Sequence, residues 1–113
     1  MGGRRDLSST KAIKAMIKTY VDENGFKFKG LQYTGKNLEE FYKVLNNPDN
    51  ELGIFVPLGS HNVVVEDSNG LFFLFHNRQI ELKKGQHFLY SKDTYIFGVF
   101  NNSELKEDFE QVK

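Results

Sequence analysis

The chain has 113 residues, no cysteine, and 15 basic against 15 acidic side chains, so its net charge is zero. This length fits a single domain, and the lack of cysteine excludes disulfides, thiolate nucleophiles and thiolate metal sites. A zero net charge disfavours a general nucleic-acid binder, which is usually clearly basic. No apolar run approaches the ~18 residues of a membrane span, and nothing resembles a signal peptide. We therefore expect a soluble, intracellular protein without membrane contact.

The N-terminal segment, residues 1–25, predicts a basic lead followed by a helix. Within residues 8–25, apolar side chains recur at three- and four-residue spacing, which is typical of one buried helix face. Ser8 or Ser9 can cap this helix, and Gly25 can end it in a left-handed conformation. The apolar face consists of Ile13, Met16, Ile17, Tyr20 and Val21.

Residues 26–35 predict a strand with an irregularity at Gly30. Phe26 and Phe28 share one parity, whereas Leu31 and Tyr33 share the other. A bulge at Gly30 would allow both pairs to face the same core.

Residues 37–47 predict a second helix. Asn37 can cap it, and Glu40 lies three residues later, where a capping box places its acidic residue. The buried face is expected to consist of Leu38, Phe41, Tyr42 and Leu45.

The rest of the chain predicts short strands and turns. Strands are expected within residues 53–58, 61–66, 71–76, 79–82, 87–91 and 94–100. Residues 101–112 predict a closing helix with Leu105, Phe109 and Val112 on one face. The expected fold is α+β: a curved, mostly antiparallel sheet or small barrel-like meander of five to seven strands with two or three helices, in one domain spanning residues 1–113.

The segment Leu71 to Phe75 is apolar on both faces of its predicted strand. Side chains alternate along a strand, so Phe72 and Leu74 point away from their neighbours Leu71, Phe73 and Phe75. The helix of residues 37–47 is expected to cover the face with Phe73, together with the closing helix. The N-terminal helix and a curled sheet are expected to cover the face with Leu74. The alternative is that a second copy of the chain or a target protein covers that face.

Catalytic and metal-binding patterns are weak in this sequence. His61, His76 and His87 are separated by 15 and 11 residues, so no two form a close-spaced ligand pair, and we interpret them as ordinary strand residues. Ser60 and His61 are adjacent but lack an orienting third group. The chain has no phosphate-binding loop motif. We therefore expect no enzyme activity, no metal and no cofactor.

The segment "GLQYTGKNLEEFYKVL", residues 30–45, together with residues 80–90 and 95–112, resembles a family of small bacteriophage proteins of the PGDYI type. The resemblance covers residues 26–113. The chain departs from the family at residues 85–88, "GQHF", where the aspartate of the family's motif is missing. Residues 7–24 have no counterpart. The resemblance implies a phage origin and a small α+β fold, and it implies no enzymatic activity.

Phage proteins of this size often bind and disable a host protein, so the resemblance favours a non-enzymatic protein that binds a bacterial host protein in the host cytoplasm and modulates it by steric occlusion. Two surfaces are candidates: a basic N-terminal segment and aromatic residues expected to be exposed. The candidate partner-binding residues are Arg4, Arg5, Lys11, Lys14, Lys18, Phe88, Tyr90 and Tyr95.

Three alternatives remain open at this point. One is a protein that sequesters a small, nucleotide-like signal in an aromatic-lined pocket. Another is a minor component of the virion. The third is that the chain forms a homodimer, in which a second copy would cover an exposed apolar face.

Overall fold

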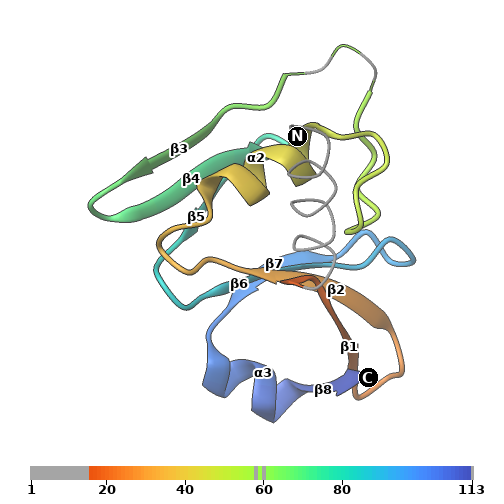
Figure 1. Cartoon of the computed structure of the whole chain (residues 1–113). Coiled ribbons are helices and arrows are strands. Elements are labelled where there is room, and N and C mark those ends of the chain that lie inside the picture. Colours follow the sequence, from red (N-terminus) through yellow and green to blue (C-terminus); the bar gives the residue numbers. More distant parts are fainter. Residues whose placement is uncertain (1–15, 58, 60, 113) are drawn as a thin grey trace, which may run out of the picture.

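The structure is a computed structural model that describes residues 16–57, 59 and 61–112 (Figure 1). These residues form an α+β fold with eight strands in two antiparallel sheets and two helices. The five-stranded sheet has the order β7-β6-β2-β1-β8, and the three-stranded sheet has the order β3-β4-β5. Both sheets are open, so the expected α+β class is confirmed, whereas the barrel-like variant does not form.

The elements have the following bounds. The five-stranded sheet contains β1 (Lys18–Asp22), β2 (Lys27–Gln32), β6 (His87–Tyr90), β7 (Phe97–Phe100) and β8 (Phe109–Val112). The three-stranded sheet contains β3 (Val64–Asp67), β4 (Gly70–Phe75) and β5 (Arg78–Leu82). The helices are α2 (Leu38–Asn46) and α3 (Asn102–Asp108).

The three-stranded sheet belongs to a long excursion between two neighbouring strands. β2 and β6 pair directly, yet α2 and all of β3, β4 and β5 lie between them in the sequence. Two backbone hydrogen bonds close the base of this excursion: Tyr33 N donates to Gln86 O at 2.8 Å, and Gly85 N donates to Tyr33 O at 2.7 Å. The excursion folds back so that the inner face of the three-stranded sheet packs on the five-stranded sheet.

Two apolar clusters hold the fold together, one on each face of the five-stranded sheet. The main cluster joins β2, β6, α2 and the inner face of β4 and β5, and Phe73 packs edge-on against Phe88 with ring centroids 5.3 Å apart. The second cluster lies under α3 and contains Tyr20, Phe28, Leu89 and Leu105. The five-stranded sheet is therefore covered on both faces.

The predicted helix includes Met16, which is helical, but its continuation through residues 17–25 is wrong, because residues 18–22 form β1. The side-chain Oδ1 of Asp22 accepts hydrogen bonds from Asn24 N and Phe26 N, which builds a hairpin turn into β2. Gly25 has the expected left-handed φ of 84°, but within this turn rather than at a helix end. The part of the predicted helix before residue 16 lies outside the described residues.

The expected bulge at Gly30 is also absent. The register of β2 with β6 runs through Gly30 without interruption, and Gly30 is also paired with Lys18 at the end of the register with β1. Phe28 therefore faces the second cluster, while Leu31 and Tyr33 face the main one. A Cβ at Gly30 would lie 2.7 Å from Leu89 Cδ1, so glycine allows Leu89 to pack closely on β2.

Helix α2 forms as predicted, with a different cap. Asn37 is buried, and its side chain accepts from Thr34 N and donates to Gln32 O instead of bonding the first turn of the helix. The expected capping box with Glu40 is therefore absent. Phe41, Val44 and Leu45 are the buried residues of α2. Of the expected stripe, Leu38 and Tyr42 are only half-buried.

Two other predicted elements differ from the structure. Residues 53–57 form no strand, although Ile54 and Val56 are buried in the main cluster. The closing helix ends at Asp108, and the chain continues as β8 beside β1. The reason is visible at Phe109, whose ring packs edge-on against Phe28 at 5.3 Å. Leu105 belongs to the second cluster, so α3 does not cover Phe73 as expected.

The two faces of β4 have opposite environments. Leu71, Phe73 and Phe75 are buried in the main cluster, and Phe73 lies against Phe41 of α2 as predicted. On the outer face, Phe72 is half-buried and Leu74 is 66% exposed. Neither sheet curls around to cover this face. The expected cover by a curled sheet is therefore wrong, and the N-terminal helix that was expected to share this role lies largely outside the described residues.

Candidate functional site

The three histidines make separate contacts. His61 approaches Tyr42, with Nδ1 3.4 Å from the tyrosine hydroxyl. His76 lies in the turn between β4 and β5, stacked on Phe97. Only His87 is in a strand, and its Nε2 is 2.7 Å from Asn102 Oδ1. Within residues 16–57 and 61–112, no three His, Asp or Glu side chains are grouped as metal ligands would be.

The predicted partner-binding residues differ in whether the structure describes them and in whether they are exposed. Arg4, Arg5, Lys11 and Lys14 lie outside the described residues, while Lys18 is exposed at the start of β1. The expectation that the two aromatic residues of β6 are exposed is wrong, because Phe88 is 0% exposed and Tyr90 is 4% exposed.

Strand parity explains why these two aromatic residues are buried. Both side chains point from β6 toward the three-stranded sheet, where each packs against Phe75. A sequence-based reading recognised aromatic residues near the end of the chain but could not tell that the excursion folds over them.

Tyr95 is exposed as expected, at 74%. It lies in the turn between β6 and β7, where Tyr95 N donates to Ser91 O and Ser91 N donates to Ile96 O. Its φ of 60° falls in the left-handed region, which a tyrosine rarely adopts. The turn therefore holds Tyr95 and its exposed neighbour Ile96 at the surface in a defined conformation.

The side of the three-stranded sheet that points away from the five-stranded sheet carries an apolar surface, which we call the outer face. Val65 pairs with Phe72, and Leu74 lies two residues further along β4 on the same side. Val63, two residues before Val65, is also exposed. The outer face is thus defined by Val63, Val65, Phe72 and Leu74.

The outer face continues into the loop after α2. Phe55 is 84% exposed, and it lines a hollow of about 150 Å³ together with Pro57, Leu74 and His76. Two acidic residues border the outer face: Asp67 shares the side of Val65, and Glu81 is the register partner of Phe72. The surface is apolar in the middle and acidic at its rim.

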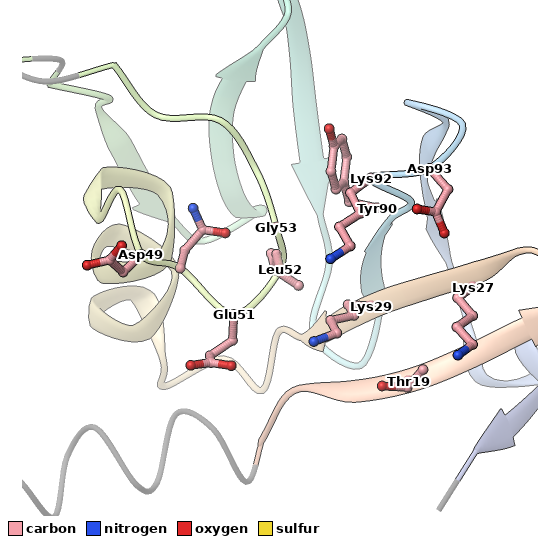
Figure 2. Close-up of a pocket in the computed structure, with 11 residues that line it drawn as sticks. Thr19, Lys27, Lys29, Asp49, Glu51, Leu52, Gly53, Tyr90, Lys92 and Asp93 are labelled. Carbon is pink, nitrogen blue, oxygen red and sulfur yellow. The ribbon is translucent and has the colours of Figure 1, made fainter.

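A polar cleft of about 490 Å³ lies elsewhere, between the five-stranded sheet and the loop after α2 (Figure 2). Lys27 and Lys29 enter it from β2, and Lys92 enters it from the turn after β6. Its remaining lining residues are Thr19, Asp49, Asn50, Glu51, Leu52, Gly53, Tyr90 and Asp93.

The shifted titrations in the described structure belong to tyrosines. The pKa of Tyr33 is raised to about 12, first by burial, then by the hydrogen bond to Glu66 (2.5 Å between the two oxygens) and by the charges of Glu66 and Asp67. Burial also raises the pKa of Tyr20, and burial together with Tyr95 raises the pKa of Tyr90. These three hydroxyls stay protonated at neutral pH, so none of them is suited to act as a general base.

The comparisons with known proteins give no match: no family model, no curated protein and no solved structure matches the chain. Among the helices of the described residues, none is both long and apolar enough to cross a membrane. The arrangement of the side chains is therefore the basis for the functional argument.

Sequence reasoning missed the position of both surfaces. The signal for the outer face was present, since Leu71 to Phe75 has no polar residue on either side of the strand. The signal for the cleft was partial: Lys27 and Lys29 are two residues apart, so they lie on the same face of the predicted strand. Their meeting with Lys92 depends on the β2–β6 pairing, which no local pattern encodes.

Proposed function

We propose that the chain is a non-enzymatic bacteriophage protein that binds a bacterial host protein in the cytoplasm and modulates it by steric occlusion. The observation that carries the proposal is the outer face, where Val65 and Leu74 are exposed on one side of a preformed sheet and Val63 is exposed just before β3. A contiguous apolar surface of this kind is typical of a protein–protein contact.

The outer face has the composition of the centre of an interface. Burying a side chain such as Leu74 or Phe72 against a partner contributes ~1.5–3 kcal/mol each. The strand backbone holds these side chains in fixed positions, so little conformational freedom is lost on binding. Phe55 adds an aromatic anchor next to Leu74, and aromatic anchors beside a hollow are common among the residues that dominate binding.

The acidic rim specifies the chemistry of the partner. Asp67 and Glu81 border the apolar middle, and no cationic residue of β3, β4 or β5 shares that side of the sheet. A partner whose apolar contact surface is bordered by lysine or arginine would match this rim, and complementary charges increase the association rate and the specificity. A second copy of the chain would instead bring two acidic rims together.

The phage origin and the mode of action are supported by resemblance alone. Residues 30–45 and the segments at 80–90 and 95–112 carry the likeness to PGDYI-type proteins, and a small size suits a protein that acts by covering a site. The basic residues Arg4, Arg5, Lys11, Lys14 and Lys18 remain a second proposed contact, on a different part of the sequence.

The test is affinity capture from bacterial lysate with the tagged chain and matched variants, followed by mass spectrometry. Leu74→Glu places a charge in the middle of the outer face. Ile96→Glu is the matched control, because Ile96 is also an exposed aliphatic residue but lies in the β6–β7 turn. A third variant replaces Arg4, Arg5, Lys11, Lys14 and Lys18 by glutamine.

We expect a stoichiometric host protein that is lost with Leu74→Glu, is retained with Ile96→Glu, and whose own activity falls when the purified chain is added. A host protein lost only with the basic-residue variant would move the contact to the N-terminal segment. Sedimentation showing a dimer that Leu74→Glu dissociates would contradict the proposal, because the outer face would then be a self-interface.

A further inference from the structure

The polar cleft of Figure 2 is built by rigid parts of the fold. Asn50 braces its loop wall: Nδ2 donates to Asn47 O at 3.0 Å and to Ile54 O at 2.7 Å, while Oδ1 accepts from Ile54 N at 3.0 Å. Leu52, in the same loop, is anchored in the main cluster. The opposite wall consists of paired strands, so the cleft exists before any ligand binds.

One lysine is positioned by a glycine across the cleft. The aliphatic part of Lys92 lies against the backbone of Gly53, where an added Cβ would be 3.2 Å from Lys92 Cδ. Figure 2 shows the ammonium groups of Lys29 and Lys92 directed into the same space, with Lys27 further along β2. Asp49 lies at the far side, on the loop wall.

The lysines of the cleft are not in direct contact with a carboxylate of the described residues. The ammonium groups of Lys27, Lys29 and Lys92 make no ion pair and no hydrogen bond there. Ammonium groups that converge without a direct ion pair are free to contact an anion, and lysine is a common point-charge ligand of phosphate.

The acidic lining residues restrict the type of anion. Asp49, Glu51 and Asp93 balance the three lysines, so the lining as a whole is neutral. A neutral lining disfavours a polyanion such as nucleic acid, whose binding requires a positive surface. Carboxylates such as Asp93 accept hydrogen bonds from hydroxyl groups, so the lining suits a ligand that has one phosphate and several hydroxyls.

We propose that this cleft binds a small phosphate ester of a sugar. The phosphate lies between Lys29 and Lys92, and the sugar hydroxyls face Asp93. The volume of about 490 Å³ is within the range of small-molecule sites, ~300–1,000 Å³, and holds a sugar phosphate or a mononucleotide. The site is independent of the outer face.

The experiment is a titration of the ¹⁵N-labelled full chain, followed by NMR, with four probes: ribose 5-phosphate, adenosine 5′-monophosphate, inorganic phosphate and ribose. Both esters are expected to shift the amide signals of Gly53 and Lys92 more strongly than phosphate or ribose does. Equal affinity for the two esters identifies a sugar-phosphate site, and tighter binding of the nucleotide shows that the base contributes.

The variant Lys29→Gln/Lys92→Gln is expected to weaken ester binding at least about ten-fold, since it removes two charge-assisted contacts. Lys84→Gln is the matched control: the stem of Lys84 lies against Gly35 as that of Lys92 lies against Gly53, but outside the cleft. Unchanged spectra at millimolar ester, or binding that survives in the double variant, would overturn the proposal. Tighter binding of a single-stranded oligonucleotide through the same lysines would also overturn it.

Discussion

The two sheets of this protein differ in how they are covered. The five-stranded sheet has an apolar cluster on each face, one under the excursion and one under α3. The three-stranded sheet has a cluster on its inner face only, although β4 carries apolar side chains on both. Apolar residues thus occur on a face that the described chain leaves open, and this difference distinguishes residues that stabilise the fold from residues that are available for binding.

The strongest test of this difference uses two neighbours in β4. Phe73→Ala is expected to lower the free energy of unfolding by about 3–5 kcal/mol, because it leaves a cavity between α2 and β6. Leu74→Ala is expected to change it by less than about 0.5 kcal/mol, as exposed positions do. Urea denaturation of both variants measures the two values. Similar losses at both positions would mean that the outer face is covered in the free protein.

The second face of the five-stranded sheet gives the next largest effect. Leu105 is the residue of α3 that enters the cluster of Tyr20, Phe28 and Leu89. Leu105→Ala is expected to cost about 2 kcal/mol, at the low end for a buried leucine because a short surface helix can settle into the space. The same urea experiment measures it, with Lys106→Ala as the exposed control in α3. A neutral Leu105→Ala would show that α3 contributes no packing.

A smaller effect is expected at the start of α3. Asn101 Oδ1 accepts from Glu104 N, and Glu104 Oε1 accepts from Asn101 N, each at 2.9 Å, so a capping box fixes the helix. Asn101→Ala is expected to cost about 1 kcal/mol in thermal or urea unfolding. Asn101→Asp retains the acceptor and is expected to restore most of this loss. Equal losses in both variants would contradict the capping role.

The smallest expected effect on stability at neutral pH comes from the ionisation of Tyr33, which lowers the free energy of unfolding only in alkali. Its pKa in the folded protein is raised to about 12, above the ~10 of an unfolded chain. Between these values the unfolded chain has lost the proton that the folded protein retains, so stability is complete below pH ~10 and declines as the pH rises to about 12. Tyr33→Phe is expected to make this decline shallower, while Tyr20 and Tyr90 maintain part of it.

Urea midpoints measured across this alkaline range test the assignment. Tyr42→Phe is a suitable control, since Tyr42 is only half-buried at the surface of α2. An identical decline in Tyr33→Phe and in the natural chain would show that Tyr33 titrates at its ordinary pKa.

Local patterns predicted the elements whose partners are close in sequence. Helix α2 and the β4–β5 hairpin correspond to their predicted segments because their periodicity and turns are contained within a few residues. Residues 18–22 did not, because the apolar spacing at Ile17, Tyr20 and Val21 fits a helix face as well as a strand. In the structure β1 pairs with the adjacent β2 on one side and with the remote β8 on the other, and the second pairing has no local signal.

Local patterns were also insufficient to predict which of the candidate site residues are buried. Phe88 and Tyr90 lie in a strand whose parity is clear from the sequence, but the sheet that covers them is contributed by the excursion. Tyr95 is exposed as expected, although it lies in a turn and not in the strand predicted for residues 94–100. The exposure of Leu74 follows from the two open sheets, whereas the sequence was equally consistent with one curved sheet that covers it.

The most direct test of the outer face uses the absence of cysteine from the chain. In Leu74→Cys the single thiol reports the accessibility of this position through its rate of reaction with a maleimide, and Ile96→Cys provides an exposed reference. We predict rapid labelling of Leu74→Cys in the free protein at every protein concentration, and slow labelling after addition of the captured host protein, with Ile96→Cys unchanged. Slow labelling of free Leu74→Cys, or a rate that falls with protein concentration alone, would contradict the account.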